Sequence, residues 1–258
     1  MKIATWNVNS IRSRLDRVIP WLERHAPDVL CMQETKVTDD QFPHDAFAAA
    51  GYRVAAHGQK TYNGVAIAAR RPLDDVRTGF DDGGPDDQAR LIAATVDGVR
   101  VLSVYVPNGK EVGHDDYRFK LEWLGRLRRY LDRNEEPARP TVVCGDFNVA
   151  LDDRDIYDPA AWEGENLASE PERRALRAVL DWGLVDAFRE LHDEAGHYSW
   201  WDYRMLAFPK NRGLRIDYCF VSPPARARLV DARIDREARK GKKPSDHAPV
   251  IIELAASA

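Results

Sequence analysis

Two polar side chains that could hold a water molecule or a hard cation, Asp146 and Asn148, follow a short apolar segment of the sequence. The segment, Thr141-Val142-Val143-Cys144-Gly145, is rich in β-branched residues and predicts a strand buried on both faces. Residues two apart in an extended backbone point to the same side, so the carboxylate and the carboxamide would project together past the sheet edge. A strand followed by an Asp/Asn turn produces the same pattern, and this segment alone leaves both interpretations open.

The same arrangement recurs in five other segments of the chain. Each joins a short apolar run to polar residues, which are Asn7 and Asn9, Glu34, Tyr105 and Asn108, Asp217, and Asp246 with His247. Open α/β sheets form their sites at the ends of strands. The six segments together therefore predict that these side chains converge on one pocket.

Glu34 is the strongest candidate for a metal ligand among these residues. Its expected neighbours, Asn7 and the Asp146/Asn148 pair, supply few negative charges and many oxygen atoms. Proteins usually hold Mg²⁺ with one or two carboxylates, several waters and the phosphate of the substrate. The sequence has no Cys and His spacing typical of a zinc site. The pattern therefore favours magnesium.

His247 has the surroundings expected of an oriented imidazole. It follows Asp246, and a separate buried carboxylate, Asp217, is available to bind its other ring nitrogen. The sequence contains neither a Ser-centred nucleophile elbow nor a Gly-rich phosphate loop with its Lys. The chemistry that remains is hydrolysis by an activated water, in which a metal and cations neutralise a phosphate and a carboxylate accepts the proton.

The segments that must position these residues alternate between strand and helix patterns. Strands are predicted near 2–8, 28–34, 64–70, 90–96, 99–106, 141–146, 214–222 and 250–252. The dipeptide Asp97-Gly98 predicts a tight hairpin between two of them, so the sheets should be mixed rather than purely parallel.

Four helices are predicted from capping residues and apolar spacing. Ser10 should cap the first, which Pro20 should kink or restart, and the second should run from about 42 to 50. Asp115 or Asp116 should cap the third, and a capping box over 169–172 should open the fourth. The polar stretch 152–168 between the last two is too long for a simple connector and is a candidate binding loop.

The composition fits a globular chain that can bury a full core. With 258 residues, 44% of them hydrophobic, it is expected to form one domain over 1–258. The first residues enter a strand directly, and no apolar run is long enough to cross a bilayer. Cys31 and Cys144 lie in predicted buried strands, which favours a reducing compartment, and a cytoplasmic location is expected.

The net charge of −4 is not that of a generic nucleic-acid coat, but the cations are clustered. The clusters lie at 126–133, 204–215 and 236–243. The first is expected to be the solvated face of a helix. The other two flank the candidate site and favour a polyanionic partner.

Six ordered motifs resemble the exonuclease III family of apurinic/apyrimidinic endonucleases, part of the endonuclease/exonuclease/phosphatase superfamily. They are Trp6-Asn7-Val8-Asn9-Ser10-Ile11-Arg12, Gln33-Glu34-Thr35-Lys36, Tyr105-Val106-Pro107-Asn108-Gly109, Gly145-Asp146-Phe147-Asn148-Val149-Ala150, Asn211-Arg212-Gly213-Leu214-Arg215-Ile216-Asp217 and Ser245-Asp246-His247-Ala248-Pro249. The resemblance spans nearly the whole chain. It implies an α/β fold, a four-layered sandwich of two mixed β-sheets packed face to face with helices outside.

The resemblance also implies a role for each matching residue. Glu34 would be the principal metal ligand, assisted by Asn7, with Asn9 and Asp246 lining a nearby part of the metal site. The ion would be Mg²⁺, with Mn²⁺ as a substitute.

The implied catalytic residues surround the attacking water and the phosphate. Asp146 would orient or deprotonate the water, with Asn148 as its hydrogen-bonding partner. His247, held by Asp217, would contact the phosphate, and Tyr105 would contact the phosphate and the transition state.

The implied DNA-binding residues lie mainly in the second half of the chain. Asn108 would contact phosphate, and Trp200, Leu214 and Ile216 would wall a pocket for a flipped-out abasic sugar. Arg204 stands where another branch of the family has an apolar wedge. Two further differences from that branch, at Asn9 and Leu214, indicate the bacterial exonuclease III type.

Arg212 and Lys243 lie in the two cationic clusters that flank the site and are expected to contact DNA. Trp201 and Tyr203 could belong equally to the DNA-contacting surface or to the core.

The function implied is a DNA repair nuclease that incises 5′ to abasic sites. The resemblance adds 3′→5′ removal of nucleotides and clearance of 3′ blocking groups on double-stranded DNA, by an enzyme expected to be monomeric and independent of membranes. The alternative is a superfamily phosphatase or phosphodiesterase that acts on a small phosphodiester or a phospholipid. A catalytically inactive DNA-binding module would require a lost ligand, and every expected ligand is present in the sequence.

Overall fold

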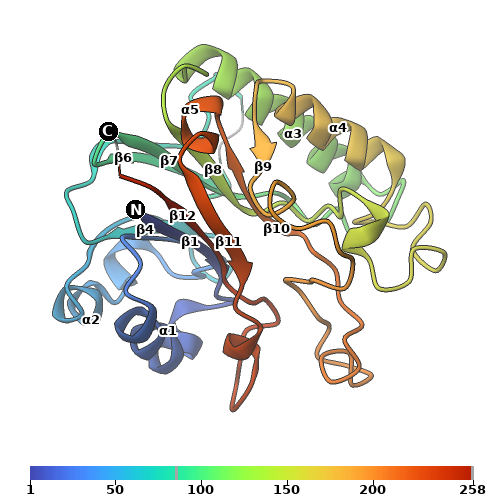
Figure 1. Ribbon diagram of the computed structural model, residues 1–258, viewed down its shortest axis with the longest axis horizontal. Coiled ribbons are helices and arrows are strands. Elements are labelled where there is room, and N and C mark those ends of the chain that lie inside the picture. Colours follow the sequence, from blue (N-terminus) through green and yellow to red (C-terminus); the bar gives the residue numbers. More distant parts are fainter. Residues whose placement is uncertain (85–86, 257–258) are drawn as a thin grey trace.

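Two six-stranded β-sheets pack face to face, and helices cover their outer faces (Figure 1). The computed structural model describes residues 1–84 and 87–256. The predicted four-layered α/β sandwich is confirmed. Within the described residues, no helix is long and apolar enough to cross a membrane.

The first sheet contains the first and the last of the described strands. From edge to edge its strands are β11 (Leu229–Ile234), β12 (Val250–Leu254), β1 (Lys2–Asn7), β2 (Val29–Gln33), β4 (Val65–Ala69) and β3 (Arg53–His57). Strand β1 pairs parallel to β2 and antiparallel to β12. The Met1 amino group donates a hydrogen bond to the carbonyl oxygen of Leu254, so the first and last strands lie side by side.

The second sheet also has six strands, and all of them come from the middle of the chain. From edge to edge they are β5 (Asp74–Thr78), β6 (Leu91–Val96), β7 (Val99–Tyr105), β8 (Thr141–Asp146), β10 (Asp217–Val221) and β9 (Val185–Asp186). Only β7 and β8 pair in parallel among these described strands, and the other pairs are antiparallel. Both sheets are therefore mixed, as the sequence predicts.

Four of the five described α-helices divide between the two outer faces, whereas the last, a single turn, packs against the core between the sheets (Figure 1). The five are α1 (Ile11–His25), α2 (His44–Ala49), α3 (Asp115–Asn134), α4 (Glu170–Leu180) and the single turn α5 (Pro223–Arg226). Apolar residues of α1 and α2 pack on the first sheet, and those of α3 and α4 pack on the second.

A third apolar core lies between the sheets. It joins Ile3 and Val29 of the first sheet to Val101, Val142 and Val221 of the second, all fully buried. Burial of one such side chain contributes about 1.5–3 kcal/mol. This core fixes the distance between the two sheets and hence between the residues at their edges.

The strand directions bring the candidate site residues to one edge of the sandwich. Asp217 begins β10 and pairs in register with Asp146 at the end of the antiparallel strand β8. Strand β12 also runs antiparallel to its neighbour β1, so His247, three residues before β12, lies near Asn7 at the end of β1. Carboxyl ends of some strands and amino ends of others therefore meet at the same edge.

Several sequence-based predictions of the elements are wrong in detail. Helix α1 continues through Pro20, which excludes the predicted restart and leaves the kink as a prediction. The cap of α3 is His114, whose Nδ1 accepts from the backbone N–H of Asp116. The strand predicted from 214 begins only at Asp217, because Leu214 instead forms isolated bridges to Ile156 and Trp200. Strands β3, β5, β9 and β11 have no counterpart among the predicted strands.

Gly145 permits the close approach of β8 to β7 beside Asp146, which gives a testable prediction. Its φ is +150°, and a Cβ atom there would lie 1.9 Å from the carbonyl oxygen of Val104. Gly145→Ala should lower the free energy of unfolding by about 3 kcal/mol or more, through overpacking and backbone strain. Chemical denaturation measures this change.

Gly125 supplies the matched control. It lies within α3, where an added Cβ would have only the Arg129 guanidinium within 4 Å, at 3.4 Å. Gly125→Ala should raise the free energy of unfolding by roughly 0.5–1 kcal/mol, because alanine favours helix. Equal stability of the two variants would show that the contact between β7 and β8 is not tight.

Candidate active site

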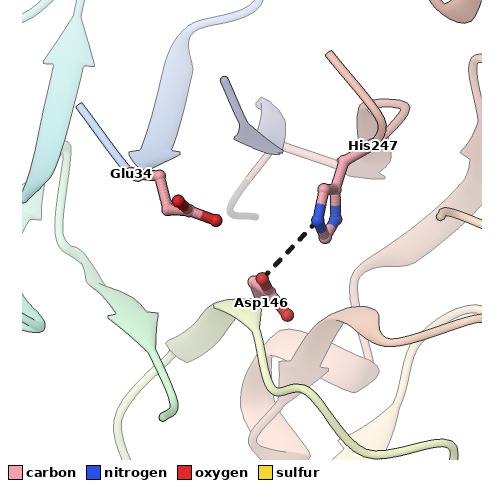
Figure 2. A group of neighbouring side chains, drawn as sticks. All are labelled: Glu34, Asp146 and His247. Atoms are coloured by element: carbon pink, nitrogen blue, oxygen red, sulfur yellow. Dashed lines mark ion pairs between the residues drawn. The ribbon is translucent and has the colours of Figure 1, made fainter. Parts of the chain in front are cut away.

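Three ionisable side chains from separate parts of the chain meet at the common edge of the sheets (Figure 2). Glu34 follows β2, Asp146 ends β8, and His247 lies in the segment before β12. One potential ligand atom of each lies within 4.8 Å of the others. The predicted convergence of these residues on one site is thus seen in the structure.

Asn7 connects the two carboxylates of this group. Its Nδ2 donates to Glu34 Oε1 at 2.9 Å and to Asp146 Oδ2 at 2.9 Å. Its Oδ1 accepts from the backbone N–H of Asn9 at 3.0 Å. Asn7 thus faces the carboxylates as a hydrogen-bond donor, and direct ligation of a metal would require its amide to turn over.

A lysine ammonium already lies among the oxygens of the expected metal site. Lys36 Nζ is 2.8 Å from Glu34 Oε2 and 2.7 Å from Asn9 Oδ1. Asn9 Nδ2 in turn donates to Asp246 Oδ1 at 2.9 Å. The presence of this ammonium shows that the oxygen donors around Glu34 suit a cation.

The backbone around these residues is unusual. Asn9, Glu34, Lys36 and Asn148 all have φ between 44° and 57°, in the left-handed region that non-glycine residues seldom occupy. Such residues cost about 1–3 kcal/mol each and cluster at functional sites. Surrounding backbone hydrogen bonds hold the 34–36 segment, including those to Glu34 O from Ser10 and to Asn63 O from Lys36.

His247 is held by a buried carboxylate. Its Nδ1 lies 2.8 Å from Asp217 Oδ2, which also accepts from Ser199 Oγ at 2.7 Å, and its Nε2 lies 3.7 Å from Asp146 Oδ2. Burial opposes protonation of the ring, but Asp217, Asp146 and Asp246 outweigh it and raise the pKa of His247 to about 10. At neutral pH the ring is therefore an imidazolium, suited to an anion rather than to a metal ion.

Asp146 has the position and the pKa of a proton acceptor. Burial raises its pKa to about 7, while the neighbouring His247 opposes the shift. A divalent cation nearby would favour the ionised carboxylate. Asp146 Oδ1 accepts from the backbone N–H of Asn148 at 2.9 Å, so the carboxylate is fixed in orientation.

Tyr105 and Asn108 border the same site. The Arg90 guanidinium lies over the Tyr105 ring, 4.5 Å from its centre. Burial, with the nearby charges of Glu34 and Asp146, raises the pKa of Tyr105 well above its usual value, so its hydroxyl remains a donor. Asn108 Nδ2 donates to Asn148 Oδ1 at 3.1 Å.

A hollow of about 540 Å³ adjoins Asn108. Trp162, Asn166, Trp200 and Arg204 also line it. Trp200 Nε1 donates to Asp246 Oδ2 at 3.1 Å, which ties this wall to the metal side of the site. The irregular 152–168 segment supplies part of the lining through Trp162, Asn166 and their neighbours.

Two residues predicted to wall a sugar pocket do not reach that hollow. Leu214 and Ile216 are 0% and 1% exposed and pack in an apolar cluster with Leu167, behind Trp200. They therefore support the wall instead of forming its surface, because the bridge between Leu214 and Trp200 turns them inward. Trp201 is also buried, whereas Tyr203 is 52% exposed.

The cationic clusters divide into exposed and buried members. Arg204, Arg212 and Lys243 are exposed, as a DNA contact requires. Arg215 is not, because it is 1% exposed and pairs with Asp155 at 2.8 Å.

The helix cluster also departs from the expected solvated face. Arg126 is 5% exposed, and its guanidinium pairs with Asp82 at 2.6 Å. It therefore forms a buried ion pair and does not face solvent.

Helix α1 holds the basic 238–244 segment in place. Arg17 donates to the carbonyl oxygens of Lys242 and Ala238, both at 2.8 Å, and to that of Lys240 at 2.5 Å. Arg14 donates to the Tyr203 hydroxyl at 3.0 Å and to Pro244 O at 3.2 Å.

Four residues at the site were not identified from the sequence as site residues. Lys36 contacts Glu34, Arg90 covers Tyr105, Ser199 supports Asp217, and Lys120 binds the carbonyl oxygen of Asn148. Lys36 lies in the motif Gln33-Glu34-Thr35-Lys36, and its position two residues after Glu34 is the sequence feature that could have identified it as a site residue. The other three lie in segments whose contacts with the site depend on the tertiary fold.

Comparison with known proteins identifies the family of the chain. Residues 4–247 match the model of the Endonuclease/Exonuclease/phosphatase family. Exodeoxyribonuclease III of Haemophilus influenzae is 35% identical, over 98% of this chain and 100% of its own length. The chain belongs to the endonuclease/exonuclease/phosphatase family.

Solved structures of this family share the whole fold. An AP endonuclease from Archaeoglobus fulgidus superposes with a TM-score of 0.96 at 41% identity, covering 99% of this chain and 100% of its own. The 3′ phosphatase NExo from Neisseria, solved bound to a product DNA hairpin, gives 0.96 at 43% identity, with coverage of 99% and 100%. The exonuclease III resemblance drawn from the sequence is confirmed.

The protonation of His247 gives a second testable prediction. In metal-free protein, an NMR titration should show His247 still charged well above pH 8, because its raised pKa keeps the proton bound until pH approaches about 10. Asp217→Asn removes the negative charge at Nδ1, so the pKa of His247 should fall. A His247 resonance that titrates near its ordinary value in the parent protein would contradict the assigned pairing.

His25 is the internal reference for this titration. It stacks on Trp21 at the surface of α1, and burial lowers its pKa below the usual value. Its resonance should be unaffected by Asp217→Asn.

Proposed function

We propose that this member of the family is a Mg²⁺-dependent DNA repair nuclease that incises 5′ to abasic sites. The same site would remove nucleotides 3′→5′ and clear 3′ blocking groups from double-stranded DNA. The observation that carries the proposal is the buried Asp217–His247 pair beside Asp146 and Glu34. In this arrangement an imidazolium would lie next to a proton acceptor. The names of the relatives, exodeoxyribonuclease III, AP endonuclease and a DNA-bound 3′ phosphatase, support a DNA substrate.

The donor set fits a hard cation. With His247 protonated, the carboxylates of Glu34, Asp146 and Asp246 are the charged oxygen donors, and the carboxamides of Asn7 and Asn9 lie among them. Asn7 would offer its oxygen only after its amide turns over, because its Nδ2 faces the carboxylates. Oxygen donors of this kind suit Mg²⁺, with Mn²⁺ as a substitute. When bound, the ion would neutralise phosphate charge and polarise a phosphoryl oxygen.

The protein's own groups supply the remaining chemistry. Asp146, fixed by Asn148, is placed to orient a water and accept its proton. The His247 imidazolium and the Tyr105 hydroxyl are donors available to the phosphate oxygens. Asn108 lies where the hollow meets the catalytic groups and is assigned to the phosphate.

DNA would lie across the exposed cations and the hollow. Trp200 and Arg204 line the hollow, while Arg212 and Lys243 stand on the two flanking segments. Leu214 and Ile216 would act through Trp200, whose wall they support. The enzyme would work as a monomer in the cytoplasm.

The metal assignment can be tested at Glu34. Glu34→Gln removes the charge but keeps the shape, so the half-saturating Mg²⁺ concentration should rise by roughly 10-fold or more. A magnesium titration of turnover, accompanied by circular dichroism to verify folding, measures this. Glu122→Gln, on the exposed face of α3, is the control and should match the parent. An unchanged half-saturation in Glu34→Gln would remove Glu34 from the metal site.

The substrate can be tested by comparing kcat/KM for three classes of phosphodiester substrate. At fixed Mg²⁺ and salt, kcat/KM should be highest on an abasic duplex, lower on an intact duplex and lowest on a small phosphodiester. An abasic nucleotide lacks the base that would have to be unstacked, so it is extruded at low cost. A preference for the small diester would instead support a phosphatase or phosphodiesterase.

Two variants test the proposed DNA-binding surface. Lys243→Ala and Arg212→Ala should weaken binding to abasic and intact duplexes alike and reduce the salt dependence of affinity, as expected for lost phosphate contacts. Arg128→Ala is the control, because Arg128 pairs with Asp132 on α3. Binding measured at several salt concentrations should leave that variant equal to the parent.

A further inference from the structure

A buried ion pair lies directly beneath two of the assigned site amides. Lys120 of α3 and Glu172 of α4 are both 0% exposed, and the Lys120 ammonium contacts the Glu172 carboxylate. The ammonium also donates to the carbonyl oxygen of Asn148 at 2.6 Å and to that of Asn108 at 3.1 Å. Its three acceptors thus come from two site segments and one helix.

All the polar groups of Asn148 form hydrogen bonds, and Lys120 is the partner of its carbonyl oxygen. The other groups are already held: its N–H donates to Asp146 Oδ1, its Nδ2 donates to Val106 O at 3.0 Å, and its Oδ1 accepts from Asn108. The backbone of Asn148 has a φ of 50°, a strained conformation that needs such support. Lys120 therefore completes the restraint on a residue that orients Asp146.

Glu172 extends the connection to the irregular loop beside the hollow. One oxygen accepts from the backbone N–H of Leu167 at 3.1 Å and the other from that of Ser169 at 3.1 Å. Asn166 Nδ2, next in the chain, donates to the carbonyl oxygens of Asn108 at 3.0 Å and Lys110 at 3.1 Å. The pair thus joins the loop at the hollow to the catalytic amides.

Direct contact of Lys120 with DNA does not fit this geometry. The side chain is fully buried, and its ammonium is surrounded by protein acceptors. Burial lowers the pKa of Lys120, and Glu172 opposes that shift. Buried ion pairs often add little net stability, but they can specify one arrangement of the groups around them.

We propose that the Lys120–Glu172 pair is a positioning device, which holds Asn108 and Asn148 in the geometry that turnover requires. The proposal rests on the proposed function of those two amides. It predicts a loss in kcat with little change in the half-saturating Mg²⁺ concentration, because the buried pair makes its contacts to Asn108 and Asn148 and none to the candidate metal ligands among the described residues.

The test uses the full chain with the pair neutralised. In Lys120→Met/Glu172→Gln no unpaired charge is left in the interior. The carboxamide introduced at position 172 retains one oxygen, which can accept from the N–H of Leu167 or from that of Ser169, but not from both. This variant should be more stable than Lys120→Met alone, which buries an unpaired carboxylate. Its kcat on an abasic duplex should still fall roughly 10-fold or more, since small misplacements of catalytic groups have effects of this size.

Hydrogen exchange supplies a readout that does not depend on activity. Exchange should accelerate in segments 106–110 and 147–150 of the double variant, where the carbonyl contacts are lost. Glu135→Gln is the matched control, because Glu135 pairs with Arg100 in another buried ion pair, 3% and 2% exposed. It should lower stability without altering kcat of the folded protein or exchange in those two segments.

The outcomes separate the two proposals. Unchanged exchange in segments 106–110 and 147–150 overturns the positioning role, whatever the substrate. Parent-like kcat, or a loss confined to KM, also overturns it when the parent cleaves DNA. A parent that cleaves no DNA contradicts the proposed function, and the exchange result then still decides whether the pair holds these segments.

Discussion

The hydrogen bonds from Asn7 to Glu34 and Asp146 connect the two sheets at the candidate active site. Asn7 and Glu34 lie at the ends of strands of the first sheet, and Asp146 ends a strand of the second. Both bonds are 2.9 Å long, so the distance between the sheets can vary little while both are kept. The apolar core between the sheets sets that distance, which makes the geometry of the site a consequence of core packing.

The charges at this edge are arranged in compensating pairs. Glu34 contacts Lys36, and Asp217 contacts His247. Asp146 is fully buried beside these groups and is bound by neutral amide donors as well as the nearby imidazolium. Because burial disfavours each isolated charge, the pairs make a buried carboxylate possible while keeping its proton affinity within a useful range.

The sequence predicted the mixed sheets and the edge of the site because those depend on local patterns. Apolar runs with polar ends identified the strands of Asn7, Glu34, Tyr105 and Asp146, whereas the layers of the sandwich were implied by the resemblance to the exonuclease III family. The edge strands were missed because they lack a fully buried apolar run: β5 is exposed throughout, and β3, β9 and β11 are mostly half-buried. Periodic burial is the signal on which strand prediction relies.

Tertiary pairing explains most of what the sequence could not show. Arg215 and Arg126 read as members of cationic clusters, yet each is buried against an aspartate far away in the chain. Leu214 and Ile216 pack behind Trp200 because of a bridge that no local pattern encodes. The contact of Lys120 with Asn148 likewise joins residues from α3 and the end of β8.

The pairing of β1 with β12 governs when a newly made chain can acquire its site. Lys2 lies opposite Glu253, so β1 cannot pair with β12 until the other described strands of both sheets have been synthesised. His247 belongs to the same late segment, and contacts between such distant residues form slowly because a long loop must close first. A growing chain therefore has Asn7, Glu34 and Asp146 before it has His247, and the reactive centre can assemble only after the segment that leads into β12 has been made.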